Sequence, residues 1–573
     1  GGWALVAEQL PYAVGAARSI ALDRHLYPEQ FKDDDRVAIV FVGEGGAQNG
    51  RMAECLNAAA KENLPILFLV IDNGRAINTF TPDVATNSDV YAQGLHYGIP
   101  GIKVNGQNLE ESLQAGKAII DHVRTKGPAI LQVHTYRFMG HSPADPEHER
   151  GRKDEKGWAR AEMDPIKLFE DWAAQSGSFT SDDLTAIKKE EQVKVKSYVK
   201  FATDSPPPPA SLAKELEYPD KPDTDYNTRE QTEQGVLTIA RSSGVVSQEA
   251  LATCEAHVAA LQEQGREGTI TVGDALNLAI LEEMLSDPTT TIHAEDLQAG
   301  SSYNIPKLTQ QTFGKLRAAD EIIDEGHFIG KALGEAMNGY RPIVELMNTN
   351  FGIYGVAEVS SAGNTYATTG GQFKMPMTII GAGGTAPNQN LGAEHSQPFH
   401  AYVMGIPGLK ICTASTPDEA YGKAKAMIRD DGPGILFTPV KMMKENRGKV
   451  DVGRCLPLNK AKQYSTASEA AIASGKAVTV LTYLHGTKEA QLAAAELAAG
   501  GGGEEMELIE LCSLKPLDLD TIRASLAKTH KLAILDESTF SGGVGATISA
   551  AVSEQMFNLL DAPVRRLCMD DAP

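Results

Sequence analysis

The chain has 573 residues, of which 42% are hydrophobic and 22% are charged. This length suits three or four domains of about 100–200 residues each, and no apolar run is long enough to cross a membrane. A formal net charge of −22 at pH 7 argues against binding to nucleic acid or to an anionic membrane surface, because both are themselves negative. Six cysteines without a Cys-x-x-Cys spacing predict free thiols in a reducing compartment rather than disulfides or a zinc site.

The first 200 residues alternate apolar, strand-like runs with helical stretches, which is typical of a doubly wound α/β domain. The apolar runs are short and uninterrupted, as in parallel strands that are covered on both faces. The expected strands are Val37–Val42, Ile66–Ile71 and Ala129–His134, and the expected helices are Ala4–Leu22, Gly50–Asn63 and Leu109–Thr125.

Polar motifs follow the first two of these strands. Residues 43–50 read Gly-Glu-Gly-Gly-Ala-Gln-Asn-Gly, and residues 71–73 read Ile-Asp-Asn. A strand, a helix and a second strand at this spacing form a right-handed βαβ unit, so both motifs are expected at the carboxyl edge of the sheet, where such sheets bind ligands. The glycines let the backbone approach a phosphate, and the amino terminus of the following helix favours negative charge. Glu44 and Asn73 then offer two hard oxygen ligands, which suit a magnesium ion on a diphosphate.

A loop that contains a histidine follows the third strand, at residues 135–146. Two prolines and a glycine constrain this loop, and its aspartate and serine can hold it through local hydrogen bonds. A single loop histidine is more often solvated than functional. Because His141 follows a strand beside the expected diphosphate site, we expect it to orient or protonate a reacting group near neutral pH.

The alternating pattern stops at residues 205–209, where a serine precedes four prolines. Proline, aspartate, threonine and glutamate dominate as far as about residue 235, which predicts an extended surface connection. A helix over Gln248–Gln264 is expected inside this connection. The remainder is interpreted as a plain linker.

From Thr269 a second α/β pattern begins, and a third follows from about Glu469. In the second pattern we expect a helix over Asp274–Leu285 and strands over Thr290–Ala294 and Arg341–Leu346. In the third we expect a turn at Gly500–Gly503 and strands over Val478–Tyr483, Glu507–Leu511 and Leu532–Leu535.

The motifs at residues 43–50 and 71–73 resemble the thiamine diphosphate motif, in which Gly-Asp-Gly is followed by a helix and by a strand that ends in Asn-Asn. Glu44 stands in place of the aspartate and Asp72 in place of the first asparagine, whereas Asn73 matches the metal-binding asparagine. The resemblance implies a Mg²⁺ and cofactor diphosphate site formed by Glu44, Gly45, Gly46, Asn73 and the backbone carbonyl of Arg75.

Residues 136–146 resemble the Tyr-Arg-x-x-Gly-His-Ser-x-x-Asp-Pro loop of the α subunit of 2-oxoacid dehydrogenase E1 components. Other thiamine diphosphate enzymes, such as transketolase, lack this loop. Residues 1–11 and 164–166 are also similar to that subunit. The resemblance implies that Val6 contacts the aminopyrimidine ring of the cofactor and that His141 acts in catalysis.

The segments 323–330, 336–345 and 392–397 resemble the β subunit of the same enzymes. Glu325 falls at the cofactor-activating glutamate, and His395 falls in the active-site histidine loop. The resemblance also implies cofactor contacts by Ile323, Met347 and Phe351. From spacing alone, Glu325 is better explained as a helix-start carboxylate, and a methionine and a phenylalanine four residues apart as ordinary core; the surrounding match favours the functional role of Glu325.

Residues 513–518 and 541–545 resemble the C-terminal domain of the β subunit. We therefore expect an α/β fold with two doubly wound thiamine diphosphate-binding domains and a transketolase C-terminal-like domain, in which an α-like part precedes a β-like part in one chain. The expected organisation is a domain over residues 1–218, a linker over 219–268, and domains over 269–462 and 463–573.

The resemblance implies thiamine diphosphate- and Mg²⁺-dependent oxidative decarboxylation of a 2-oxoacid, in first place pyruvate, with acyl transfer to a lipoyl-bearing E2 acyltransferase. Glu325 is expected to activate the cofactor, and His141 and His395 to steer substrate and protons. Two chains are expected to form a homodimer equivalent to an α2β2 assembly. Several stretches are most similar to the plastid-type pyruvate dehydrogenase E1, which implies the plastid stroma, with the mitochondrial matrix or bacterial cytoplasm as alternatives.

Several positions depart from the family pattern. Glu44 is one methylene longer than aspartate, which moves its carboxylate by up to ~1.5 Å. The segment Gly355–Thr365, which holds Ala357 and Glu358, is one residue shorter than the family's helix, and Ala382–Asn390 is longer than the matching loop. The upstream part of the α subunit is absent, and both ends of the chain are expected to be truncations, so no targeting peptide can be judged. A structural or regulatory relative without turnover, and an E1 for branched-chain 2-oxoacids or acetoin, stay open as alternatives.

Overall fold

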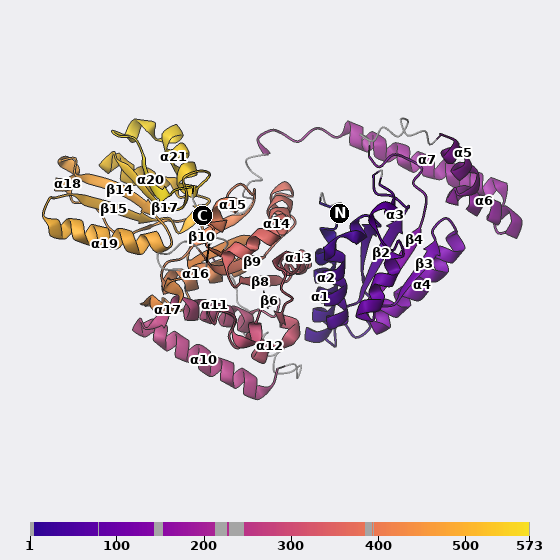
Figure 1. Cartoon of the computed structure of the whole chain (residues 1–573), viewed down its shortest axis with the longest axis horizontal. Helices are drawn as coiled ribbons and strands as arrows, with labels where there is room; N and C mark the ends of the chain where they lie inside the picture. Colours follow the sequence, from indigo (N-terminus) through magenta and orange to yellow (C-terminus); the bar gives the residue numbers. More distant parts are fainter. Residues whose placement is uncertain are drawn as a thin grey trace. The chain divides into compact units, whose positions relative to one another are not determined.

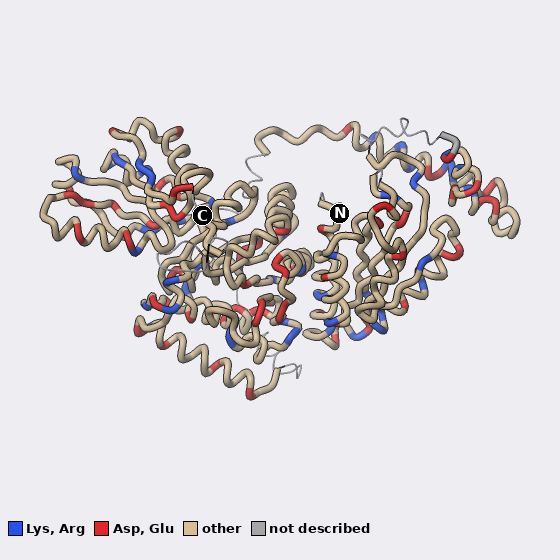
Figure 2. Tube along the Cα trace, in the orientation of Figure 1, with Lys and Arg blue, Asp and Glu red and all other residues tan. Residues whose placement is uncertain are grey.

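The structure, a computed structural model, describes residues 5–77, 79–142, 153–212, 226–227, 246–383, 392 and 395–571. It divides into two compact units, Gly1–Ala21 with Asp33–Ala213 and Leu22–Lys32 with Lys214–Pro573 (Figure 1). Basic and acidic residues alternate along both units, so the net negative charge is not confined to one segment (Figure 2). None of the described helices is long and apolar enough to span a bilayer.

The first unit is built on a parallel sheet of four strands in the order β1-β2-β4-β3. The strands are β1 (Ala38–Gly43), β2 (Ile66–Asp72), β3 (Gly101–Asn105) and β4 (Ala129–His134). Gly43 at the end of β1 lies beside Ile71, and Asp72 at the end of β2 lies beside His134 at the end of β4. The carboxyl ends of these three strands therefore share the edge at which the sequence predicts the polar motifs.

Helices cover both faces of this sheet. Side chains alternate along β2, so Phe68 packs with α1 (Gln9–Leu26) and α2 (Gly50–Glu62), whereas Leu67 packs with α4 (Leu109–Lys126). The Asn49 side chain accepts a hydrogen bond from the backbone N–H of Arg51 and so caps α2. The predicted strands and the second and third predicted helices are confirmed to within one residue at each end, but α1 begins at Gln9 rather than Ala4.

Several elements of the first unit were not expected from the sequence. In β3 only Val104 is buried, so this strand has no apolar run to reveal it. The helices α3 (Thr81–Val84) and α5 (Lys153–Glu162) were not expected either, whereas the one helix expected between residues 164–166 and 205–209 is present as two, α6 (Pro165–Ser176) and α7 (Ser181–Asp204). The longest of them, α7, starts with a capping box of Thr180 and Asp183 and has no buried side chain.

The second unit begins with a domain that we call the second domain, which extends from α10 to β12. Its seven-stranded sheet has the order β16-β10-β11-β9-β8-β6-β7, and only β16 is antiparallel to its neighbour. The strands are β6 (Thr290–Ala294), β7 (Ala318–Asp320), β8 (Arg341–Leu346), β9 (Thr378–Gly383), β10 (Lys410–Thr413), β11 (Gly434–Pro439) and β16 (Ser513–Lys515), with a separate pair β5 (Ile270–Thr271) and β12 (Arg447–Gly448). The strands predicted at 290–294 and 341–346 are confirmed as β6 and β8.

The helices of the second domain surround this sheet (Figure 1). They are α10 (Gln248–Glu267), α11 (Val272–Ser286), α12 (Thr309–Arg317), α13 (Glu325–Met337), α14 (Val356–Thr368), α15 (Phe399–Val403), α16 (Pro417–Arg429) and α17 (Met442–Glu445). The predicted helix Asp274–Leu285 is confirmed within α11. Ala357 and Glu358, which depart from the family pattern, lie on α14, where Glu358 is buried. Of the loop predicted to be long, residues 384–390 lie outside the described part of the chain.

The third domain has a sheet of five strands in the order β13-β15-β14-β17-β18. The strands are β13 (Lys462–Gln463), β14 (Ala477–Thr482), β15 (Glu505–Glu510), β17 (Leu532–Thr539) and β18 (Arg565–Met569), and the helices are α18 (Glu469–Ala473), α19 (His485–Gly500), α20 (Leu519–Thr529) and α21 (Val544–Gln555). Strand β16 comes from this part of the chain but pairs with β10 of the second domain. Thr413 Oγ1 also donates to the Leu511 carbonyl at 2.7 Å, so the two domains are joined through one sheet edge.

The helix predicted over Gln248–Gln264 is present as α10, and it packs on the second domain. Helix α10 lies in the predicted linker, yet its apolar residues at helical spacing, Leu251, Cys254, Val258 and Leu261, are buried in the core of the second domain. Its His257 ring also contacts Asn277 Oδ1 of α11 at 3.1 Å. The polar composition of the region masked this amphipathic pattern.

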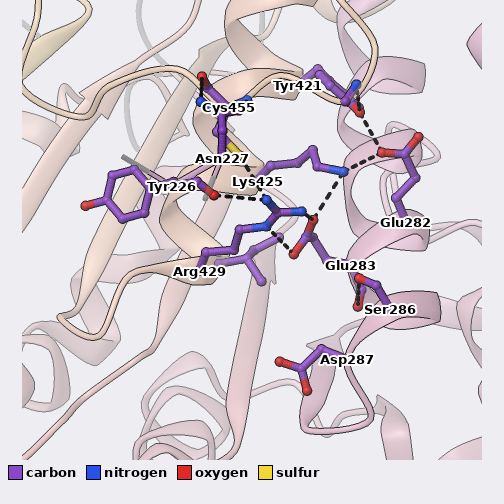
Figure 3. A network of polar contacts seen from close by, with 12 residues as sticks. Tyr226, Asn227, Glu282, Glu283, Ser286, Asp287, Tyr421, Lys425, Arg429 and Cys455 are labelled. Carbon is purple, nitrogen blue, oxygen red and sulfur yellow. Dashed lines mark hydrogen bonds and ion pairs between the residues drawn. The ribbon is translucent and has the colours of Figure 1, made fainter. Parts of the chain in front are cut away.

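A short described segment of the predicted linker is also fixed to the second domain. The backbone N–H of Cys455 donates to Asn227 Oδ1 at 2.7 Å, and Arg429 donates to the Tyr226 carbonyl at 3.0 Å (Figure 3). The Tyr226 hydroxyl donates to Asp430. Residues 226–227 are therefore docked structure, which a linker interpretation did not predict.

Candidate active site

Glu44 lies at the end of β1, where the chain turns into the glycine-rich segment. The side chain is buried, and its Oε2 accepts from the backbone N–H and the side-chain amide of Asn73, both at 3.4 Å. Burial raises the pKa of Glu44, the nearby charge of Asp72 raises it further, and backbone N–H groups partly offset both effects. The two ligand-type residues predicted from sequence are thus direct neighbours at the sheet edge.

Two oxygen atoms at this edge are unsatisfied. Glu44 Oε1 and Asn73 Oδ1 are buried and accept no hydrogen bond from any residue that the structure describes. An unsatisfied buried acceptor costs about 1–3 kcal/mol, and a cation with oxygen ligands removes that cost. Carboxylate and amide oxygens are ligands that Mg²⁺ prefers. The donor set therefore fits Mg²⁺, despite the longer side chain of Glu44.

The glycines after Glu44 keep this edge accessible. A Cβ atom on Gly45 would lie 3.2 Å from Ala76 Cβ, and one on Gly46 would lie 3.0 Å from Val42 Cγ2 and 3.3 Å from Val6 Cγ1. Side chains at these positions would crowd the loop that follows β2 and the segment before α1. Val6 is thereby located beside the glycine-rich motif, with its side chain largely exposed.

Asp72 has a structural role at this edge. Its Oδ1 accepts from the backbone N–H of Gly74 at 3.0 Å, and its Oδ2 accepts from the Gln132 amide at 2.8 Å. These bonds turn the chain sharply after β2, and Gly74 takes φ +78°, which favours glycine. Arg75 follows directly and is bridged to Phe80.

Arg137 holds the loop after β2 from the neighbouring strand end. Its guanidinium donates to the backbone carbonyls of Ala76 and Ile77 at 2.6 and 2.7 Å. The backbone of Arg75 is thereby fixed next to Asn73. Sequence analysis noted Arg137 only as part of a family motif, and its position in the loop after β4 was the available signal.

His141 belongs to the same loop but is exposed to solvent, and residues 143–152 lie outside the described part of the chain. The preceding part of the loop is well anchored, since the Thr135 backbone N–H donates to the Asp72 carbonyl at 2.7 Å and the Thr135 hydroxyl to Gln107 at 2.8 Å. The structure thus brings the loop to the edge that carries Glu44 and Asn73.

In the second domain, Glu325 is the first residue of α13. Asp324 caps this helix by accepting from the backbone N–H of His327 at 2.7 Å. Glu325 is buried, and burial followed by the charge of Asp324 raises its pKa. A carboxyl group of this kind holds its proton closer to neutral pH than an exposed glutamate does.

Two further buried glutamates were missed by sequence analysis. Glu295 follows β6, and burial together with the charges of Glu325, Asp296, Asp324 and Glu321 raises its pKa to about 7. Glu345 is the last residue but one of β8, and burial raises its pKa to about 8. Glu295 Oε1 and Glu345 Oε2 accept no hydrogen bond from the described residues. An acidic residue directly after a strand, and a charge inside an apolar strand, were the available signals.

The other residues predicted for the cofactor site in the second domain lie on separate segments of the chain. The rings of Phe351 and His395 meet edge to face with centroids 5.1 Å apart, and Asn348 donates to the His395 carbonyl at 2.8 Å. Met347 is half-buried beside Asn348 in the chain. Ile323 is 88% exposed on the segment before α13. Glu394, next to His395, lies outside the described residues.

A different cluster has metal-ligand residue types, and one of its members, Glu419, is occupied by protein donors, whereas Glu510 Oε2 accepts no hydrogen bond from the described residues. Glu419, Glu510 and Cys512 have ligand atoms within 4.8 Å of one another between the second and third domains. Glu419 already accepts four hydrogen bonds: from the backbone N–H groups of Ser415 and Thr416 at 2.9 and 3.1 Å, from Lys462 at 2.6 Å and from Tyr464 at 3.1 Å. Lys462 supplies the positive charge, so the cluster is a polar contact between domains.

The fold and these residues define a chain with two doubly wound α/β domains and a smaller third domain, in which one sheet edge has the oxygen donors of a magnesium site. Three family models match it in order: Dehydrogenase E1 component over residues 2–211, Transketolase, pyrimidine binding domain over 268–445, and Transketolase, C-terminal domain over 469–573. Helix α10 thus precedes the second match.

Curated relatives match the second part of the chain. The pyruvate dehydrogenase E1 component subunit beta of Gracilaria tenuistipitata var. liui is 41% identical over 302 residues, which are 52% of this chain and 90% of that subunit. The corresponding subunit of Chaetosphaeridium globosum is 38% identical over 302 residues, with 52% and 89% covered. The chloroplastic subunit beta-3 of Oryza sativa subsp. japonica is 37% identical over 336 residues, with 58% and 82% covered.

The chain therefore belongs to the thiamine diphosphate-dependent dehydrogenase E1 family, as a fusion of an α-like part and a β-like part. This confirms the resemblance and the α/β fold class that the sequence motifs predict.

Proposed function

We propose that the chain is an E1 component that oxidatively decarboxylates a 2-oxoacid and transfers the acyl group to a lipoyl group on an E2 acyltransferase. The favoured substrate is pyruvate. The observation that carries this proposal is the pair of unsatisfied oxygens, Glu44 Oε1 and Asn73 Oδ1, at the sheet edge of an E1-type domain. Pyruvate is favoured because the similar β subunits are named as parts of pyruvate dehydrogenase.

We assign residues to cofactor binding in each of the two parts of the chain. Glu44, Asn73 and the Arg75 carbonyl hold Mg²⁺, and the backbone at Gly45 and Gly46 accepts the diphosphate. Bound thiamine diphosphate supplies the carbanion chemistry that breaks the bond between the carboxylate and the carbonyl carbon of the 2-oxoacid. The organic rings of the cofactor are contacted by Val6, Ile323, Met347 and Phe351.

Three residues are proposed to handle protons. Burial raises the pKa of Glu325 at the start of α13, so its carboxyl group keeps its proton to a higher pH than an exposed glutamate does. His395 is held by the ring of Phe351 and by Asn348, and its exposed imidazole orients the substrate. His141, on the loop after β4, is assigned the same kind of role because imidazole exchanges protons near neutral pH.

The assembly and location follow from the same proposal. Two chains pair into a homodimer equivalent to α2β2, and an E2 acyltransferase that bears a lipoyl group is the acceptor. We propose the plastid stroma as the compartment, since several similar β subunits are chloroplastic, with the mitochondrial matrix or bacterial cytoplasm next. The domains are proposed as residues 1–218, about 246–462 and 463–573, with the linker shortened to about 219–245.

Release of carbon dioxide from a set of 2-oxoacids tests the proposal. The full chain is incubated with Mg²⁺, thiamine diphosphate and an artificial electron acceptor, and with pyruvate or a branched-chain 2-oxoacid. We expect release from pyruvate that depends on both cofactors. Release only from branched-chain acids would change the substrate, and no release from any acid by folded protein would favour a structural or regulatory relative.

A further inference from the structure

A buried network of charged side chains lies between α13 and the ends of β6 and β7. His293 Nδ1 is 2.8 Å from Glu321 Oε1, and His293 Nε2 is 3.1 Å from Glu335 Oε2. Lys331 Nζ is 2.7 Å from Glu321 Oε1, and the Thr291 hydroxyl donates to Glu335 Oε2 at 2.6 Å. The four charged side chains are at most 3% exposed.

The network fixes the helix that begins with Glu325. Lys331 and Glu335 are one turn apart on α13, whereas His293 belongs to β6 and Glu321 directly follows β7. The backbone N–H of Glu321 also donates to the Ala294 carbonyl at 2.9 Å, so the two strand ends are themselves joined. Any slip or tilt of α13 would therefore separate buried ionic partners, which is strongly unfavourable.

The protonation of His293 decides the charge of this network. Two glutamates, one lysine and a neutral histidine carry a net charge of −1, whereas a protonated histidine makes the four side chains neutral. Nδ1 is hydrogen-bonded to Glu321 Oε1 at 2.8 Å, whereas Nε2 lies 3.1 Å from Glu335 Oε2 without forming a hydrogen bond.

The network also reaches the acidic residues around Glu325. The charge of Glu321 raises the pKa of Glu295, after burial and the charges of Glu325, Asp296 and Asp324. Burial raises the pKa of Glu345, and the charge of Glu295 raises it further. Glu321 is thus shared between the buried network and the acidic group that contains Glu325.

We propose that His293, Glu321, Lys331 and Glu335 form a positioning network for Glu325, which holds the first turn of α13 in place and fixes the charge that the neighbouring Glu295 faces. This inference rests on the proposed role of Glu325. The four residues do not need to touch substrate or cofactor, because they hold helix α13 in place and because the charge of Glu321 acts on Glu295.

A second buried network in the same domain provides a matched control. Glu283 of α11 accepts from Arg429 at 2.7 Å and lies 3.2 Å from Lys425, both on α16 (Figure 3). Glu283 and Glu321 are equally buried glutamates with buried cationic partners. Glu283→Gln and Glu321→Gln therefore remove the same kind of ionic contact, but only the second contact lies beside Glu295.

Infrared titration of Glu295 tests the proposal without cofactor. A protonated buried carboxyl group has its own carbonyl absorption, and subtracting the spectrum of a Glu295→Gln protein isolates that of Glu295. We expect a titration midpoint near pH 7 in the natural chain. The midpoint should fall in Glu321→Gln, because a negative charge is removed, rise in Lys331→Met, because a positive charge is removed, and stay unchanged in Glu283→Gln.

A purely structural network predicts a different result. Glu321→Gln and Glu283→Gln would then lose similar thermal stability, while all midpoints stayed equal, and this outcome overturns the proposal. The pH profile of pyruvate-dependent turnover should shift in the same direction as the infrared midpoint. Shifted midpoints without turnover in any variant would refute the proposed E1 function but keep the network, whereas turnover with unshifted midpoints would refute the network alone.

Discussion

Glu44→Gln separates the stability of the first unit from its ability to bind Mg²⁺. In the chain without ligand, Glu44 is a buried carboxylate with one unsatisfied oxygen, and Asp72 repels its charge. An amide keeps the shape but removes the charge. We expect the substitution to stabilise the unliganded first unit by about 1 kcal/mol, which corresponds to a thermal midpoint about 2–4 °C higher for a domain of about 200 residues.

Added cofactor should reverse the order of the two thermal midpoints, so that the natural chain becomes more stable than Glu44→Gln. At 100 times its dissociation constant, a ligand stabilises the native state by about 2.7 kcal/mol, or about 5–11 °C for a domain of this size. The natural chain should gain this amount with Mg²⁺ and thiamine diphosphate together. Glu44→Gln should gain almost nothing, because an amide oxygen without charge replaces one of three protein ligands.

Differential scanning calorimetry with and without the ligands measures both effects. Glu62→Gln is the matched control: Glu62 pairs with the buried Arg18 at 2.8 Å, at the far end of α2 from Glu44. This variant should lose stability, because a buried guanidinium loses its partner, but keep the full gain with cofactor. The reasoning is refuted if Glu44→Gln gains as much from the ligands as Glu62→Gln does.

Three further predictions concern the second unit. Glu325→Gln should still bind the cofactor in a calorimetric titration, but its turnover should be lower by about 10²–10⁴-fold. An unchanged turnover rate would exclude the proton-handling role of Glu325. Burial raises the pKa of Glu510 to about 8, above the ordinary value of 4.5, so the folded chain holds a proton that the unfolded chain loses. This group should therefore lower the free energy of unfolding of the natural chain by about 1.4 kcal/mol for each pH unit between about pH 5 and 8. Glu510→Gln should remove this pH dependence. Thermal melts in which the natural chain and Glu510→Gln lose stability equally with rising pH would contradict the prediction. Leu261→Ala on α10 should lower the stability of the second unit by about 2–5 kcal/mol. If this segment were a plain linker, the substitution would leave the thermal midpoint unchanged.

Local sequence was sufficient for the edge that carries Glu44 and Asn73. Three uninterrupted apolar runs mark β1, β2 and β4, and short motifs with glycine and asparagine follow the first two. Because parallel strands present their carboxyl ends together, the motifs had to be neighbours. That Glu44 Oε1 and Asn73 Oδ1 are unsatisfied depends on the placement of side chains, and no sequence pattern contains that information.

Contacts between distant segments account for what the sequence did not predict. The network of His293, Glu321 and Glu335 joins residues that are up to 42 positions apart, and each of them alone is an ordinary polar residue. Strand β16 pairs with β10 across about 100 residues. The helix over Gln248–Gln264 was predicted and is present as α10, but its burial against the second domain was not predicted.

The central claim is that the chain is a working E1 component. Its most direct test is pyruvate-dependent reduction of an artificial electron acceptor by the full chain, with and without Mg²⁺ and thiamine diphosphate. We predict turnover that requires both and that Glu44→Gln abolishes. Folded protein that binds neither ligand and reduces no acceptor with pyruvate or a branched-chain 2-oxoacid would contradict the claim.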